Sequence, residues 1–414
     1  MMRVLWFTNS PSNYVGNKNP YNGGGWISSL ENELKKHGDI ALAISFLMAN
    51  QPKKKVEDRV TYYPIQFEQY SWKSKFSSKF HINDFSYEKR EWSKFFKPMQ
   101  DVISDFKPDI IEIFGSELPF ALIASVTKVP VVLHIQGVLA PTWNAFFPPM
   151  VSPFLYCIQS LNPKAIFQKV MEIVGFKRSV WREREELARV QNYIARTEWS
   201  RRVIHALNPT ARFFYGGEIL RDVFYEESKR SLPKQLTIIS TISQPMYKGF
   251  DLILKTAKLL KEQYVLDFEW KVFGNIKPSF VEKQLGICHK DVCVKLEGIA
   301  NAAHLKQELE NATVYAHTAY IENSPNSVCE AEILGIPVIA TNVGGVISLI
   351  DEGETGYLVP ANDPYQMAFF IEQLYENKKL NIEIGGKARK KALERHNKGK
   401  IIEDLIQTYR TIIG

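Results

Sequence analysis

Short β-branched runs alternate along this chain with segments of helical spacing. Near-continuous apolar stretches such as Pro108–Phe114 and Pro130–Ile135 are typical of strands in a parallel sheet covered on both faces. Helical spacing is clearest over residues 26–37, which Gly38 ends. Further strands are predicted over residues 3–8, 40–47, 192–196, 235–241, 266–273, 292–296, 313–316 and 338–341. This alternation predicts an α/β fold.

The stretch from Tyr320 to Gly345 combines a loop, a short helix, a tight turn and a buried strand. Ser324 is a good N-cap and Pro325 a good first helical residue, so we expect the helix to begin there. Gly335 can end it, before the strand Val338–Thr341. The free N–H groups at such a helix start suit a phosphate. Glu322 in the loop and Glu330 in the helix can accept hydroxyl groups, because ionised carboxylates only accept hydrogen bonds.

These residues resemble the retaining nucleotide-sugar glycosyltransferases of family four. The shared pattern is Glu322-x7-Glu330, then Gly-x-Pro-Val-Ile-Ala at residues 335–340 and Gly-Gly at 344–345. Pro-Asn within the spacer, at 325–326, also matches many members. Two glutamates at this spacing alone indicate little, since many helices carry them. The resemblance rests on the whole series of matches in the right order.

The resemblance implies the GT-B fold, in which two Rossmann-like domains with parallel sheets face across a central cleft. The implied reaction moves a sugar from a nucleotide-diphosphate donor to a hydroxyl acceptor with retention, in polysaccharide or glycolipid assembly. By analogy, Glu322 binds the donor sugar or assists at the reaction centre, and Ser324 and Asn326 meet the phosphates. Glu330 accepts from the ribose hydroxyls. No protein nucleophile is assigned, because in this family the departing phosphate is thought to act as the base.

Donor binding is expected to involve further residues of the second half. Lys248 matches a family lysine that holds the diphosphate, and positive charge is what a departing diphosphate needs. The partner arginine of the family is missing, with Ile242 or Ser243 at its place. Gly274 ends a strand where the family seats the nucleotide base by backbone contacts. No Asp-x-Asp motif is placed to bridge a diphosphate, so we expect no metal and no cofactor besides the donor substrate.

The first half of the chain matches the glycosyltransferase family less closely than the second half. A polar loop ends in Gly23-Gly24-Gly25 before a helix, and it can be a ligand loop or a flexible turn. The resemblance favours Gly24 and Gly25 in the cleft. His134 and Gln136 lie at the carboxyl end of a strand, where α/β sheets bind ligands. Either side chain can face the cleft, and for His134 packing in the core is slightly favoured.

Two segments of the first half are less regular. Residues 51–100 are rich in lysine and aromatic residues and are interpreted as an insertion. Residues 140–175 contain many prolines and are interpreted as a loop over the first domain. Trp143 and Phe147 are candidates for stacking on a sugar or lipid-linked acceptor, or for membrane contact; packing under the loop is an equal alternative.

Composition excludes several classes of protein. The net charge of +7 is too small and dispersed to indicate nucleic acid, and it fits anionic small ligands or an anionic membrane face. No apolar run reaches about 18 residues, so we expect no spanning helix. The scattered cysteines indicate a reduced, cytoplasmic protein, or one at the inner membrane face. Cys288-His289 and Cys293 lack a second pair at ligand spacing, which argues against zinc.

We therefore predict an acceptor domain over residues 1–212, a linker over 213–233 and a donor domain over 234–397. By the resemblance, an amphipathic C-terminal helix at about 398–414 returns to the first domain. Two alternative functions use the same fold. A sugar-nucleotide 2-epimerase would need additional acid and base residues around the sugar. A non-catalytic nucleotide-sugar binding protein is compatible with the missing arginine.

Overall fold

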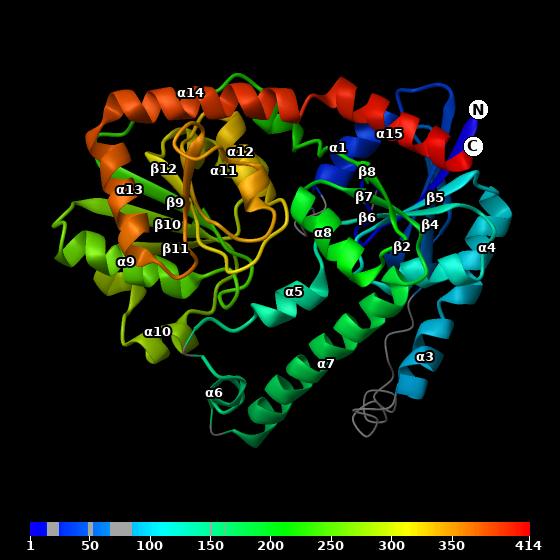
Figure 1. Ribbon diagram of the computed structural model, residues 1–414, viewed down its shortest axis with the longest axis horizontal. Coiled ribbons are helices and arrows are strands. Elements are labelled where there is room, and N and C mark those ends of the chain that lie inside the picture. The colour runs from blue at the N-terminus through cyan, green and yellow to red at the C-terminus, as the bar shows by residue number, and fades with distance from the viewer. Residues whose placement is uncertain (15–24, 49–52, 67–84, 150, 161) are drawn as a thin grey trace. The chain divides into compact units, whose positions relative to one another are not determined.

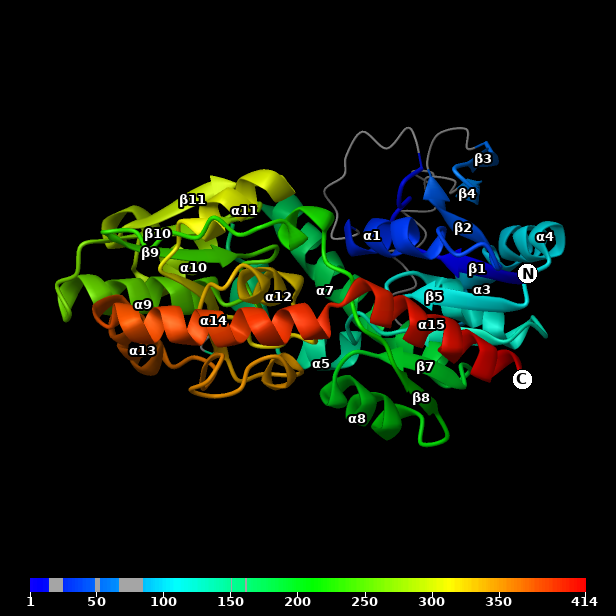
Figure 2. The ribbon, with the colours of Figure 1, turned by 90° about the horizontal axis from the view of Figure 1, so that it is seen from above.

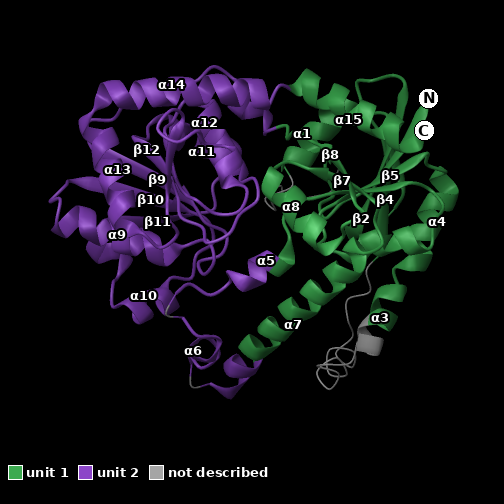
Figure 3. Ribbon diagram, in the orientation of Figure 1, with its two compact units in different colours: residues 1–140, 168–219, 398–414 green, residues 141–167, 220–397 purple. Residues whose placement is uncertain are grey.

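The computed structural model describes the 414-residue chain except residues 15–24, 49–52, 67–84, 150 and 161 (Figure 1). The chain forms two compact units, each with its own sheet (Figure 3). Unit 1 comprises residues 1–140, 168–219 and 398–414, and unit 2 comprises residues 141–167 and 220–397. Residues 141–167 fold with unit 2, whereas the sequence predicts them in the first domain, over residues 1–212.

Unit 1 contains an eight-stranded sheet in the order β3-β4-β2-β1-β5-β6-β7-β8. All neighbouring strands are parallel except β3, which runs antiparallel to β4. The strands are β1 (Met2–Phe7), β2 (Ile40–Met48), β3 (Lys55–Glu57), β4 (Val60–Gln66), β5 (Ile110–Phe114), β6 (Val131–His134), β7 (Asn192–Ala195) and β8 (Arg212–Tyr215). The central strands β5, β6 and β7 are buried along their whole length, as their apolar sequences predict.

The helices of unit 1 come from three separate parts of the chain. They are α1 (Gly25–Leu34), α3 (Phe85–Ser93), α4 (Phe96–Phe106), η1 (Pro119–Ser125), α8 (Glu198–Leu207), α15 (Lys398–Ile413) and most of α7 (Pro163–Leu187). Helix α15 packs against α1 and β5 (Figure 2). It brings the side chain of Tyr409 into the core. The Tyr409 hydroxyl donates to the buried Glu112 carboxylate and accepts from the indole N–H of Trp6 at 3.0 Å. The last helix is therefore tied to the first and central strands of this sheet.

Unit 2 contains a six-stranded, all-parallel sheet in the order β11-β10-β9-β12-β13-β14. The strands are β9 (Leu236–Thr241), β10 (Phe268–Phe273), β11 (Val294–Gly298), β12 (Val314–His317), β13 (Val338–Thr341) and β14 (Gly356–Val359). Every residue of β12 and β13 is buried, so both faces of the sheet are covered at its centre.

The remaining helices belong to unit 2. They are α5 (Leu139–Asn144, which starts at the boundary), α6 (Pro153–Cys157), η2 (Asp222–Tyr225), α9 (Phe250–Glu262), α10 (Ser279–Leu285), η3 (His289–Val292), α11 (Ala302–Glu310), α12 (Asn326–Ile333), η4 (Val346–Ser348), α13 (Pro364–Glu376) and α14 (Lys378–Arg395). Helix α9 contacts α10 and α13, and α12 contacts α14. Within the described ranges, no helix is both long and apolar enough to cross a bilayer.

The strand order creates a switch point in the second sheet. From β9 the chain builds β10 and β11 on one side, and then returns to add β12, β13 and β14 on the other. The loops that follow β9 and β12 therefore leave the same edge of the sheet in opposite directions. Parallel α/β sheets bind ligands at such a point, outside the carboxyl ends of the strands.

Three local predictions are corrected by the structure. Residues 140–175 are not a loop, because they form α5, α6 and the start of α7. Residues 212–215 form β8, paired with β7, so the predicted linker begins inside a strand. Helix α12 is capped by Pro325 without a side-chain hydrogen bond, so Ser324 is not its N-cap. Proline has no N–H to donate and a fixed φ, which suits the entry to a helix.

Candidate active site

The loops after β9 and β12 pack directly against each other at the switch point. The hydroxyl of Thr318 donates to the Lys248 carbonyl at 2.9 Å, and the Tyr320 N–H donates to the Tyr247 carbonyl at 2.7 Å. Gly249 has φ +76°, and a Cβ there would lie 1.9 Å from the Thr318 carbonyl oxygen. Only glycine allows this approach. The two loops are thereby held at the spacing that places Lys248 beside residues following β12.

Lys248 forms an ion pair with Glu322 across these loops. Their side chains are 17% and 19% exposed, so a ligand can reach both. Burial opposes the charge on each group, but their mutual attraction outweighs it. The pKa of Lys248 is therefore raised and that of Glu322 lowered. Both groups are charged at neutral pH, with cation and anion side by side at the ligand-binding edge.

His317, the last residue of β12, adds a third titratable group at this point. Its side chain is buried, and burial together with the charge of Lys248 lowers its pKa to about 4, against the opposing attraction of Glu322. The ring is therefore neutral at pH 7. Its Nε2 atom has no hydrogen-bond partner among the described residues. A neutral imidazole can offer that atom as donor or acceptor, depending on its tautomer.

The Gly-Gly sequence after β13 supports the backbone of Glu322. The Gly345 N–H donates to the Glu322 carbonyl at 2.9 Å. Gly344 has φ +54°, and a Cβ there would lie 1.9 Å from the same carbonyl oxygen. The loop can close on Glu322 only because residue 344 has no side chain. This gives the Gly-Gly part of the motif a direct physical role in positioning the carboxylate.

Glu330 lies inside α12 and is buried, with both carboxylate oxygens bound to one arginine. Arg221 donates from Nε to Oε1 and from Nη2 to Oε2, each at 2.7 Å. Burial raises the pKa of Glu330, and the Arg221 charge opposes that rise. The side chain of Arg221 is 27% exposed, so the pair lies at the border between core and solvent. Each oxygen keeps a lone pair for a further donor.

Ser324 and Asn326 lie at the start of α12, as the motif predicts, and both are partly exposed. Asn326 is the first helical residue. Gly274 follows β10 with φ +134°, and a Cβ there would lie 1.8 Å from the Ile242 carbonyl oxygen. Its N–H donates to the Gly298 carbonyl at 2.7 Å. These residues lie in the same unit as the Lys248–Glu322 pair, and their contacts with a donor remain predictions.

The glycine-loop and strand-end candidates of the first half of the chain belong to unit 1. His134 is 1% exposed and its Nδ1 atom is hydrogen-bonded to Glu112 at 2.8 Å, while burial lowers its pKa. This places His134 in the polar network that also includes Tyr409. Gln136 is partly exposed. Gly25 begins α1, and Gly24 lies outside the described residues.

Trp143 and Phe147 are members of an aromatic cluster in unit 2. Their ring centroids are 6.1 Å apart, and Phe147 lies 5.5 Å from Tyr156. The neighbouring Phe146 lies 5.9 Å from Tyr247, the residue before Lys248. Both candidate rings remain partly exposed. The cluster therefore combines packing with an accessible aromatic surface that reaches, through Tyr247, the loop carrying Lys248.

Sequence reasoning missed two residues of this site. His317 could have been identified, because it ends a strand at the ligand-binding edge, but the strand was predicted to end at Ala316. Arg221 carried no such signal, since it lies in the segment interpreted as a linker and meets Glu330 across 109 residues of sequence. Its position follows only from the folded structure.

Comparison with known proteins gives a family for part of the chain. The family model described as glycosyl transferases group 1 matches residues 233–377. The capsular polysaccharide biosynthesis glycosyltransferase CapM of Staphylococcus aureus is 34% identical over 103 residues, or 25% of this chain and 27% of CapM. Matches to this and seven other similar curated proteins each span less than half of that protein's length.

Solved structures show the same fold over the whole chain. Sucrose-phosphate synthase from Thermosynechococcus elongatus superimposes with a TM-score of 0.72 at 14% identity, covering 100% of this chain and 99% of that one. HepE from Anabaena, in complex with UDP, gives a TM-score of 0.64 at 14% identity over 99% of this chain and 100% of HepE. The predicted α/β fold of the GT-B type is confirmed.

Proposed function

We propose that this chain, whose residues 233–377 match the family model of glycosyl transferases group 1, transfers a sugar from a nucleotide-diphosphate sugar to a hydroxyl acceptor. The observation that carries the proposal is the Lys248–Glu322 pair at the switch point of the second sheet. A cation and an anion at this point can bind the diphosphate and the sugar of one donor molecule. The cation faces the diphosphate, and the carboxylate faces the sugar hydroxyls.

The chemistry requires stabilisation of negative charge as the bond between sugar and phosphate breaks. Lys248 and the free N–H groups at the start of α12 supply positive potential for the departing nucleoside diphosphate. When phosphate oxygens take over the Lys248 ammonium, Glu322 is released to accept hydrogen bonds from the donor sugar. We expect Ser324 and Asn326 to contact the phosphates. Transfer then proceeds with retention, without a metal ion and with the departing phosphate as the base.

Glu330 is proposed to receive the ribose of the donor. Two hydrogen bonds from Arg221 orient its carboxylate and oppose the rise in pKa that burial causes. The remaining lone pairs suit the two hydroxyls of a ribose. UDP is the first nucleotide to test, because HepE, which has the same fold, was solved with UDP.

We propose a sugar or lipid-linked sugar as the acceptor, used in polysaccharide or glycolipid assembly in the cytoplasm or at the inner membrane face. The similarity to CapM, a capsular polysaccharide biosynthesis glycosyltransferase, supports this class. The aromatic cluster beside Lys248 can stack on sugar rings. On α6, Phe154 and Leu155 are 68% and 37% exposed, which suits contact with the lipid of such an acceptor.

The test is a panel of UDP-, GDP- and ADP-sugars incubated with the full chain, with and without hydroxyl acceptors. Release of free nucleotide that requires an acceptor identifies a transferase. Interconversion of the donor sugar without an acceptor would identify an epimerase instead. Binding of every nucleotide sugar with no turnover for any acceptor would overturn the proposal in favour of a binding protein.

Variants connect the activity to the site. Glu322→Gln should abolish turnover. Glu330→Gln should weaken nucleotide binding, and it should also lower the melting temperature because it leaves Arg221 without its charged partner. Glu383→Gln is the matched control, since Glu383 forms an exposed ion pair with Lys387 elsewhere in unit 2. Unchanged nucleotide affinity in Glu330→Gln would refute the ribose assignment.

A further inference from the structure

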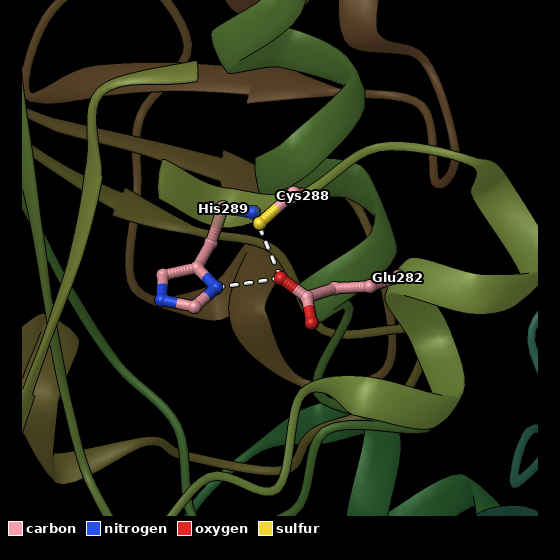
Figure 4. A group of neighbouring side chains, drawn as sticks. All are labelled: Glu282, Cys288 and His289. Carbon is pink, nitrogen blue, oxygen red and sulfur yellow. Dashed lines mark hydrogen bonds and ion pairs between the residues drawn. The ribbon is translucent and has the colours of Figure 1, made fainter. Parts of the chain in front are cut away.

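A cluster of three potential metal ligands lies in unit 2 after helix α10. Glu282 is in that helix, and Cys288 and His289 follow it in the turn that leads into η3 (Figure 4). One ligand atom from each residue lies within 4.8 Å of the others. In the sequence, Cys288-His289 and Cys293 lack a second pair at ligand spacing, which argues against zinc. Folding supplies the third ligand from within the preceding helix.

The local backbone fixes this arrangement. Helix α10 ends at Gly286, whose φ of +65° is the left-handed conformation that reverses the chain. The reversed chain brings the His289 N–H to Oε1 of Glu282 at 2.8 Å. The same oxygen lies 2.5 Å from Nδ1 of His289 and is hydrogen-bonded to Cys288. Thiol, imidazole and backbone N–H thus converge on a single carboxylate oxygen.

We propose that Glu282, Cys288 and His289 bind a zinc ion, with water as the fourth ligand. A thiolate, an imidazole and a carboxylate form the mixed donor set that zinc accepts in tetrahedral sites. On binding, the Cys288 thiol gives up its proton, and the His289 ring offers the lone pair of Nδ1 to the metal while its own proton is on Nε2. The backbone N–H of His289 remains to hold the carboxylate in place.

The fit requires a small rearrangement. Tetrahedral ligands at about 2.0–2.1 Å from zinc are roughly 3.3 Å apart, so the Glu282 and His289 atoms separate by somewhat less than 1 Å. The side chains of Glu282 and His289 are 18% and 15% exposed, and Cys288 is partly exposed. This exposure leaves room for the shift and a path by which the ion and its water ligand enter.

The position of the site separates it from the proposed reaction. The turn precedes β11, so the ligands lie toward the amino edge of the sheet, whereas Lys248 and Glu322 follow the carboxyl ends of β9 and β12. Zinc there would join the end of α10 to the turn that leads into β11. We therefore expect it to stabilise unit 2 without taking part in sugar transfer.

The full chain is first treated with a chelator to remove metal. Its binding of zinc is then measured by calorimetry and by competition with a chromogenic chelator. We expect one zinc ion per chain, a rise in melting temperature with zinc, and release of protons on binding. Cobalt should give the charge-transfer absorption of a single thiolate ligand. Absence of stoichiometric zinc binding would overturn the proposal.

Matched variants identify the ligands. Cys288→Ser keeps a donor to Glu282 but removes the thiolate, and His289→Gln removes the imidazole. Each should lower zinc affinity at least tenfold, since even partners one step removed from a metal cost about 10–100-fold. Cys293→Ser and His304→Gln, which change another thiol and another imidazole of unit 2 outside the cluster, should bind like the native chain. Equal affinity in the native chain and in either ligand variant would refute the assignment.

Discussion

Replacing Gly344 by alanine should displace Glu322 and remove most of the activity. A Cβ at this position would lie 1.9 Å from the Glu322 carbonyl oxygen, whereas ordinary contact begins at 3.4 Å. The carbonyl and the Gly344 backbone must therefore separate by 3.4 − 1.9 = 1.5 Å. A shift of 1 Å in a catalytic group can lower a rate about 100-fold. We expect a loss of donor turnover of at least that size.

Gly353 provides a control for the effect of Gly344→Ala on stability. Gly344 and Gly353 have φ of +54° and +75°, so alanine at either position costs roughly 1–2 kcal/mol in backbone strain. A Cβ at Gly353 meets nothing within 4 Å. Gly353→Ala should therefore lower the melting temperature by only a few degrees. Gly344→Ala should melt lower still, because it adds the collision with Glu322.

The assay is thermal melting of both variants together with donor turnover and nucleotide affinity. Gly353→Ala should keep native turnover, which controls for strain at a positive φ. The reasoning fails if the two variants melt at the same temperature and turn over donor equally. If the native chain turns over no donor, the difference in melting temperature decides alone.

Two further predictions concern buried groups. Burial lowers the pKa of His317 from 6.5 to about 4. Between these pH values the imidazole is protonated only in the unfolded chain. The free energy of unfolding should therefore fall by about 3 kcal/mol as the pH falls from 6.5 to 4. His317→Gln should lose that slope in urea unfolding, and an equal slope in both proteins would contradict the burial argument. Tyr409→Phe removes the donor to buried Glu112 and should cost about 1–3 kcal/mol, measured by melting. Tyr365→Phe, at a side chain 71% exposed, is its control and should be neutral; equal effects would exclude a role for the buried hydroxyl.

The strands were predictable because burial on both faces leaves a continuous apolar sequence. Val338–Thr341 was predicted with the bounds that β13 has, since Pro337 precedes a run of β-branched residues. The prolines of residues 140–175 favour a loop, whereas the structure has helices there. Pro153 and Pro163 were interpreted as loop residues, yet each is the first residue of a helix, where a missing N–H costs nothing.

The chemistry of the site was predictable to the extent that it depends on motifs. The motif named Glu322 and Lys248, and the structure shows that they form an ion pair. Partners distant in sequence could not be inferred, because their proximity arises from the packing of separate elements. Arg221 beside Glu330 is one case. Glu282 beside Cys288 and His289 is another, since it depends on the reversal at Gly286.

The attachment of α15 to unit 1 has a consequence for the order of synthesis. Proteins emerge from the ribosome amino end first, and domains generally fold in that order. Here Tyr409 completes the network around Trp6 and Glu112, so unit 1 lacks part of its core until residues 398–414 have been made. Residues 220–397 of unit 2 emerge before that point. The half of the protein that is translated first is thus completed after unit 2, and a nascent chain stalled before residue 398 would present a completed unit 2 and an incomplete unit 1.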